Sequence, residues 1–252
     1  MSGLSAVIIT RNEAHNIVRC LRALKGVCTD VVVVDAESSD DTAALARAEG
    51  ARVIVRKWTD YSDQKNFANA QAVHPWVLSL DADEELSDTL RTALQRALDK
   101  GLAGAYAMDR LTNYCGQWVR HGGWYPDTKV RLFHRDQARW EGSHVHETLA
   151  LAPGIPVHRL DGDLLHYSYP TLASHAERIE RYSTLHAQKM YAAGKQASVV
   201  KRWLSPVAKF LSGYLLQGGL LDGRAGWHIA RLSAKAVHLK YAKLHALHHG
   251  RS

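Results

Sequence analysis

The sequence predicts an α/β fold: a mixed, mostly parallel sheet with helices on both faces, followed by a helical C-terminal region. Short apolar and β-branched runs recur up to residue 80 without strict alternation, which is typical of strands covered on both faces. Helix-compatible segments separate these runs, as in a wound parallel sheet. From Thr171 onward the pattern is helical to the end. We therefore expect two domains, residues 1–170 and residues 171–252.

The individual elements follow from the same patterns. Strands are expected at residues 4–9, 31–34, 52–55 and 76–80. Helices are expected at residues 15–24, 40–50 and 88–101, where apolar residues recur at helical spacing. Ser87 is suited to be the N-cap of the last of these helices, and Gly101 ends it.

After residue 102 the rhythm changes. Strand-like runs at residues 103–108, 130–133 and 164–169 are separated by stretches rich in Trp, His and Gly, which commonly form the walls of a site. Residues 201–223 then form an amphipathic segment that is marginal in length for spanning a bilayer.

The length and cysteine content exclude some classes of protein. A chain of 252 residues, 46% of them hydrophobic, can bury a full-sized core. Cys20, Cys28 and Cys115 lack the spacing of a disulfide framework or a zinc finger. We therefore expect reduced thiols in a cytoplasmic protein.

The basic charge is concentrated at the C-terminal end. Residues 171–252 contain 13 Lys and Arg but 3 Asp and Glu, whereas residues 1–170 contain 19 and 22. A basic region suits an anionic partner, such as a phosphorylated glycolipid, a membrane surface or a nucleic acid. The sequence has no recognisable nucleic-acid-binding module, and its acidic clusters would repel phosphate, so we do not expect nucleic acid as the partner.

Three polar clusters follow predicted strands at the point where each strand ends. They are residues 10–13, residues 35–41 and residues 81–83. Ligands of parallel sheets bind beyond the carboxyl ends of the strands, so these clusters should meet at one edge. Asp81 and Asp83 could bind Mg²⁺ or Mn²⁺, with substrate phosphates completing the coordination.

Taken in order, these segments resemble the inverting family 2 glycosyltransferases of GT-A fold, which bind nucleotide sugars on a Rossmann-like sheet. The resemblance rests on VIITRNEAHNIVRCLRAL, VVVVDAESSDDT, DQKNFANAQAVHPWVLSLDADEEL, VRLFHR and WEGSHVHE. The later segments LLHYSYPTLASHAERIERYS and LLQGGLLDGRAGW are similar to the subgroup that adds glucose, in β-1,4 linkage, to the inner-core heptose of bacterial lipopolysaccharide.

The resemblance implies a UDP-sugar donor, a divalent cation and a role for each motif residue. Residues expected at the nucleotide are Thr10, Arg11, Asn12, Glu13, Asp35, Ser38 and Asp40. Lys65 is expected near the diphosphate, and Asp81, Ala82 and Asp83 near the ribose and the metal. His146 or, as the alternative, His166 could complete the metal coordination or contact the diphosphate.

An inverting transfer also needs a general base, which the family commonly takes from an acidic residue beyond the DxD motif. The candidates are Glu147, Glu141 and Asp127, of which Glu147 is favoured because it adjoins His146.

The predicted protein is a metal-dependent hexosyltransferase on the inner face of the bacterial inner membrane. Its predicted acceptor is an anionic glycolipid, the lipopolysaccharide core. A polyprenyl phosphate or a protein is the alternative acceptor, and a basic nucleic-acid-binding protein is the alternative of a different class. The oligomeric state is not predicted.

Overall fold

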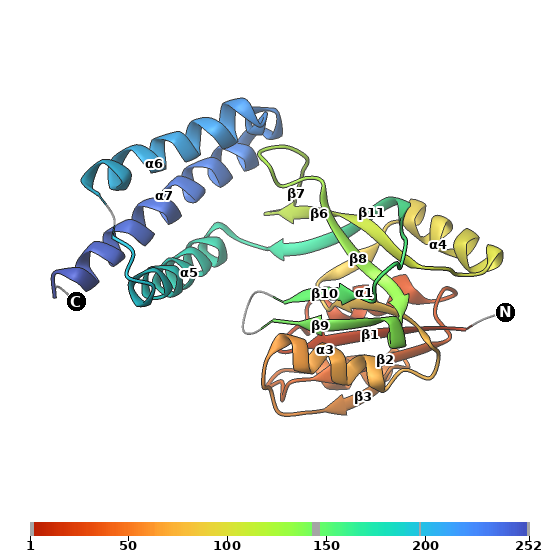
Figure 1. Cartoon of the computed structure of the whole chain (residues 1–252). Helices are drawn as coiled ribbons and strands as arrows, with labels where there is room; N and C mark the ends of the chain where they lie inside the picture. The colour runs from red at the N-terminus through yellow and green to blue at the C-terminus, as the bar shows by residue number, and fades with distance from the viewer. Residues whose placement is uncertain (1–2, 143–146, 197, 251–252) are drawn as a thin grey trace. The chain divides into compact units, whose positions relative to one another are not determined.

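The computed structural model describes residues 3–142, 147–196 and 198–250. The chain divides into two compact units (Figure 1). The first comprises Met1–Arg110 and Asp127–His166, and the second comprises Leu111–Pro126 and Tyr167–Ser252. The second unit thus combines the C-terminal helices with residues 111–126, which the sequence analysis placed in the first domain. The proposed division of function at residue 170 stays a prediction.

The parallel half of the sheet belongs to the first unit. It contains β1 (Leu4–Thr10), β2 (Asp30–Asp35), β3 (Arg52–Val55) and β4 (Trp76–Asp81), in the order β3-β2-β1-β4. All four predicted strands are confirmed. The register places Thr10 opposite Asp35 and Ile9 opposite Asp81. The polar clusters that follow these strands therefore begin at the same edge of the sheet.

The other half of the sheet contains antiparallel pairs. Beyond β4 the order continues with β8 (Asp127–His134), β6 (Ala105–Tyr114), β11 (Val157–Tyr169) and β5 (Glu84–Leu86). β8 is antiparallel to β4 and β6, and β5 is antiparallel to β11. β9 (Ala138–Glu141) and β10 (Thr148–Leu151) form a separate hairpin-like sheet. The predicted mixed α/β fold is confirmed.

Helices cover both faces of this sheet. Side chains of α1 (Ile17–Leu24), α2 (Thr42–Ala48) and α4 (Asp88–Lys100) share one apolar layer with Ala6 and Ile8 of β1. α3 (Tyr61–Ala70) packs in the other layer, with Val7 and Ile9. Alternate residues of one buried strand thus supply the two layers.

Helix α4 begins where the sequence predicts, because the Ser87 side chain accepts a hydrogen bond from the Leu90 N–H at 3.2 Å. The sequence analysis did not predict α3. Its buried positions include Gln64, Lys65 and Asn69, so its inner side lacks the apolar periodicity that identifies a helix.

The second unit is mainly helical, as predicted. It contains β7 (Gln117–Val119), α5 (Leu172–Ala192), α6 (Val199–Leu211), a π-helical turn η2 (Ser212–Leu216), a 3₁₀ turn η3 (Gly219–Asp222) and α7 (Gly223–His248). α7 packs against both α5 and α6. A small core joins Tyr114 and Val119 to Ala225 and Ile229 of α7. No described helix combines the length and the apolar character needed to cross a bilayer.

The contact between β11 and the start of α4 generates a stability prediction. Gly162 has φ +96°, and a Cβ atom there would lie 2.3 Å from the backbone nitrogen of Leu90. Gly154 also has a positive φ, +81°, but a Cβ atom there meets nothing within 4 Å. Urea unfolding should show that Gly162→Ala costs about 2 kcal/mol more than Gly154→Ala, because overpacking adds to backbone strain. Equal losses would contradict the close approach.

Candidate active site

The loops that follow β1 and β2 are tied together by side chains. The Asn12 N–H donates to Ser38 Oγ at 2.8 Å, and Asn12 Oδ1 accepts from the Ser39 N–H at 2.8 Å. The Glu13 N–H donates to Thr42 Oγ1 at 2.8 Å. Asn12 has φ 56°, a left-handed conformation that Asn adopts more readily than most residues. The two sequence clusters therefore form one polar surface.

Asp35 lies at the base of this surface. It is 1% exposed, and its carboxylate accepts hydrogen bonds from the N–H and the hydroxyl of Ser38. The hydroxyl of Thr10 is buried and has no hydrogen-bond partner in the structure. Asp40 accepts from the Ala14 N–H at 3.2 Å, while Arg11 is exposed. Hydrogen bonds thus join Asn12, Glu13, Ser38 and Asp40 in the loops after β1 and β2. Thr10 and Asp35 lie opposite each other at the ends of these two strands.

Asp81, at the end of β4, is paired with two buried cations. Its Oδ1 lies 3.1 Å from Lys65 Nζ, and its Oδ2 lies 2.7 Å from Arg131 Nη2. Burial alone would raise the pKa of Asp81, but Arg131 and Lys65 outweigh burial and hold the pKa well below its usual range. Asp81 is therefore ionised, and both of its oxygens already have partners.

The ion pairs continue beyond Asp81. Glu84 Oε1 accepts from Arg131 at 2.5 Å and lies 3.5 Å from Arg110, which pairs with Asp127 at 2.6 Å. Glu84 Oε2 accepts from the Asp81 N–H at 2.9 Å. The sequence analysis assigned no role to Arg131, Glu84 or Arg110. A charged residue inside the apolar run VRLF was a usable signal, because a buried charge needs a partner.

Lys65 is enclosed by the elements around it. Its Nζ lies 4.4 Å from the centre of the Trp140 ring and 3.5 Å from Glu147 Oε1. The side chain of Asn66 holds β9 in place, since it exchanges hydrogen bonds with the backbone of Trp140 at 2.8 and 2.9 Å. The structure therefore places Lys65 between two carboxylates, Asp81 and Glu147.

Asp83 has a different partner. Its Oδ2 lies 3.2 Å from His166 Nε2, while the intervening Ala82 is 3% exposed. Burial alone would raise the pKa of Asp83, but the hydrogen bond from His166 outweighs it and lowers the pKa. His166 Nδ1 is buried without a hydrogen-bond partner.

The carboxylate of Asp83 is a ligand type that suits Mg²⁺ and Mn²⁺, and His166 Nε2 lies 3.2 Å from it. Over the described ranges, no group of three or more His, Cys, Asp and Glu side chains is arranged to hold a metal ion. The predicted cation site therefore stays a prediction, in which water and substrate phosphates would have to supply the remaining ligands. His146, the other predicted ligand, lies outside the described residues.

The three candidate bases have different surroundings. Glu147 lies beside Lys65, with its side chain 23% exposed. Glu141 is exposed on β9. Asp127 pairs with both Arg110 and Lys129. Burial would raise the pKa of Asp127, but Lys129 and Arg110 lower it, which makes Asp127 a weak proton acceptor. The choice of Glu147 as the base stays a prediction.

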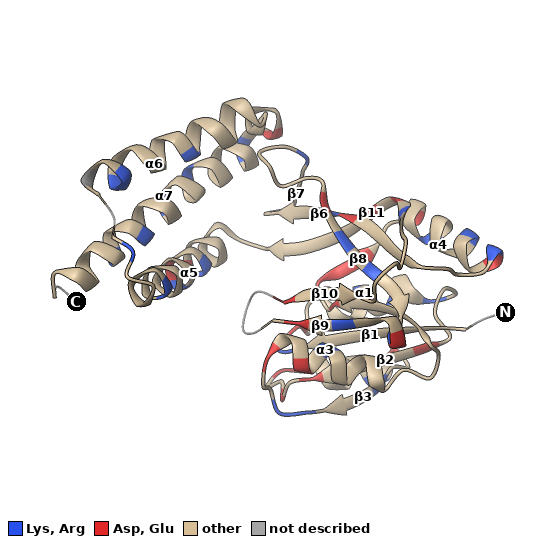
Figure 2. Ribbon diagram, in the orientation of Figure 1, with Lys and Arg blue, Asp and Glu red and all other residues tan. Residues whose placement is uncertain are grey.

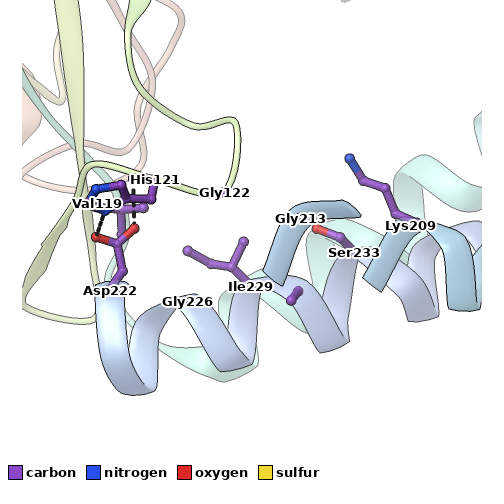
Figure 3. A pocket seen from close by; sticks show the side chains of 10 residues that line it. Val119, His121, Gly122, Lys209, Gly213, Asp222, Gly226, Ile229 and Ser233 are labelled. Atoms are coloured by element: carbon purple, nitrogen blue, oxygen red, sulfur yellow. Dashed lines mark hydrogen bonds and ion pairs between the residues drawn. The ribbon is translucent and has the colours of Figure 1, made fainter. Parts of the chain in front are cut away.

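The second unit holds a small cavity between the 119–122 segment and the helices (Figure 3). Its volume is about 10 Å³, enough for about one water molecule. Asp222 beside it accepts from the N–H of His121 at 2.8 Å and lies 2.9 Å from His121 Nδ1. The cavity is too small for a sugar. The contacts between Asp222 and His121 hold the 119–122 segment against the helices.

Comparison with known proteins identifies the class to which this fold and site belong. Residues 5–150 match the model of glycosyl transferase family 2, and the chain belongs to this family. The predicted family is confirmed.

Relatives match over nearly the whole chain. An uncharacterized glycosyltransferase of Rickettsia typhi is 30% identical, over 98% of this chain and 88% of the relative. The lipopolysaccharide core biosynthesis glycosyltransferase LpsC of Rhizobium meliloti is 29% identical, over 97% and 93%. A solved mannosyltransferase of Pyrobaculum calidifontis, in complex with GDP-Man and Mn²⁺, is 16% identical with a TM-score of 0.50, over 96% and 86%. This last likeness concerns the fold, and it agrees with the predicted GT-A architecture.

The buried ion pairs generate a prediction. Arg131→Met should lower the free energy of unfolding by about 3–5 kcal/mol, because Asp81 and Glu84 would lose a buried cation. The control is Arg22→Met, whose side chain is 66% exposed and whose partner Glu49 also pairs with Lys25, and which should cost about 1 kcal/mol or less. Both losses can be measured by urea unfolding. A loss for Arg131→Met no larger than the control's would contradict the assigned pairing.

Proposed function

We propose that this chain is an inverting glycosyltransferase that moves glucose from UDP-glucose to a lipid-linked saccharide, the inner-core heptose of lipopolysaccharide. The observation that carries the proposal is the group of Asp81, Asp83, Lys65, His166 and Glu147 at the carboxyl end of β4. The likeness to LpsC, a lipopolysaccharide core biosynthesis glycosyltransferase, extends over nearly the full chain and supports the acceptor class. The preference for UDP and glucose rests on the motif resemblance.

The donor would bind across the ends of β1, β2 and β4. The carboxylate of Asp35 is suited to accept a hydrogen bond from an N–H of the nucleotide base. Thr10 lies opposite Asp35 at the end of β1, and its hydroxyl has no hydrogen-bond partner in the structure. Both oxygens of Asp81 pair with cations, yet each keeps a lone pair that can accept from a ribose hydroxyl. We therefore assign ribose contact to Asp81.

Asp83 and His166 would hold the divalent cation, for which the Mn²⁺ in the mannosyltransferase complex is an independent parallel. Such a cation offsets the negative charge that gathers on a departing diphosphate. Asp81 would help to position Asp83, because the ion pairs of Asp81 with Lys65 and Arg131 fix the end of the strand that precedes Asp83.

Glu147 would act as the base. It would take the proton of the acceptor hydroxyl while that oxygen attacks the anomeric carbon from the side opposite UDP. The bond from the anomeric carbon to the diphosphate oxygen breaks, and its electron pair leaves with UDP, so the configuration inverts. The partial exposure of Glu147 lets it release the proton to solvent afterwards. Lys65 at 3.5 Å would orient the carboxylate.

The C-terminal region would face the acceptor. Its 13 basic against 3 acidic residues complement a phosphorylated glycolipid at the cytoplasmic face of the inner membrane.

The assignment of the base can be tested with Glu147→Gln. Transfer from UDP-glucose to a core oligosaccharide ending in heptose should fall by about 10²–10⁴-fold, because general base catalysis contributes that much. UDP binding, measured by calorimetry, should be unchanged. Glu141→Gln is the matched control, since Glu141 is exposed on β9, and it should keep normal turnover. Normal turnover in Glu147→Gln would move the base to Glu141 or Asp127.

A further inference from the structure

Helix α6 exposes its apolar side chains. Val200, Trp203, Leu204, Val207 and Leu211 are 44–63% exposed. Their spacing places them on one side of the helix. We call these five residues the α6 apolar face.

The opposite side of α6 is the more buried one. Arg202, Ser205, Pro206 and Phe210 are partly buried, and α6 packs against α7. A helix that only covers a protein core buries its apolar stripe and exposes its polar side. In α6 the apolar stripe is exposed, while polar residues such as Arg202 and Ser205 are partly buried. Packing against the protein core therefore does not account for its apolar face. The turns that follow expose further large side chains, Leu216 at 84% and Leu221 at 66%.

The surroundings of the α6 apolar face are basic. Lys201 is exposed on α6 next to this face, Lys209 is exposed on the far side of the same helix, and the helices carry further Lys and Arg (Figure 2). Residues 193–252 contain 10 Lys and Arg but one carboxylate side chain, Asp222. Asp222 is buried and bonded to His121, so it does not offset this charge at the surface.

We propose that the α6 apolar face is a membrane-docking surface, which lies at the boundary of acyl chains and headgroups in an anionic bilayer. Apolar side chains beside lysines on one helix are the pattern of helices that lie in the plane of a membrane interface. Anionic headgroups would attract the basic residues, while Trp203, Leu204 and Val207 would leave water.

A second copy of this chain fits the surface less well. An interface related by twofold symmetry places the same patch on both partners. Lys201, which adjoins this face, would then approach its counterpart in the other copy, and the side chains of residues 193–252 offer no exposed carboxylate to pair with it. Charge complementarity therefore favours the bilayer.

This proposal deepens the membrane-facing part of the proposed function, and its test uses no sugar transfer. The full chain is sedimented with vesicles of phosphatidylethanolamine and phosphatidylglycerol, and with phosphatidylcholine vesicles. The test variant is Leu204→Glu with Val207→Glu. The control is Val73→Glu with Leu185→Glu, which changes charge equally at apolar side chains that are 65% and 46% exposed outside α6.

The test variant should bind anionic vesicles at least about tenfold more weakly than the control, because it alone loses apolar insertion. Brominated acyl chains should quench tryptophan fluorescence in the wild type, and Trp203→Phe should remove most of that quenching while retaining binding. Unchanged melting temperature and UDP binding would show that the variants fold.

Equal affinity of test and control variants for anionic vesicles would overturn the proposal, since charge alone would then explain binding. A dimeric wild type that the test variant converts to monomers, with vesicle binding unchanged, would also overturn it and assign the face to a second copy. If the wild type fails to transfer sugar to a soluble oligosaccharide yet the vesicle result holds, the proposed function fails and this surface stands.

Discussion

The structure depends on the neutralisation of a carboxylate at the end of a buried strand. Asp81 ends β4 in the middle of the sheet, where burial penalises its charge, and Lys65 and Arg131 reach it from α3 and β8. Elements far apart in sequence are therefore joined by charge as well as by apolar packing. Glu84 pairs with both Arg131 and Arg110, so the network of ion pairs continues from β8 to β5 and β6.

That arrangement separates the two aspartates of the DxD motif. Asp81 has a cationic partner at each oxygen, whereas the ion pair that Asp83 forms within the described residues is with His166. One aspartate thus stabilises the strand end, and the other is the residue that we propose as a ligand of the cation. The paired carboxylates of a sequence motif need not share one role, because neighbouring residues decide which oxygen atoms are available.

The sequence allowed much of the fold to be predicted. Four parallel strands, the cap at Ser87 and the helical C-terminal region follow from local patterns. α3 could not be found in this way, because its inner side carries polar residues that serve the site. The partners of Asp81 were also missed, since Arg131 lies 50 residues away and no local pattern encodes such a pairing. Nor does helical spacing reveal which side of α6 faces the protein.

The central claim is that Asp83 and His166 hold a divalent cation together with a nucleotide diphosphate. Its most direct test is calorimetric titration of UDP in the presence of Mn²⁺ and in the presence of chelator, with the wild type and Asp83→Asn. The account predicts that Mn²⁺ tightens UDP binding to the wild type and that this gain disappears in a folded Asp83→Asn protein. UDP binding that is equally tight with Mn²⁺ and with chelator, or a Mn²⁺ effect retained by Asp83→Asn, would contradict it.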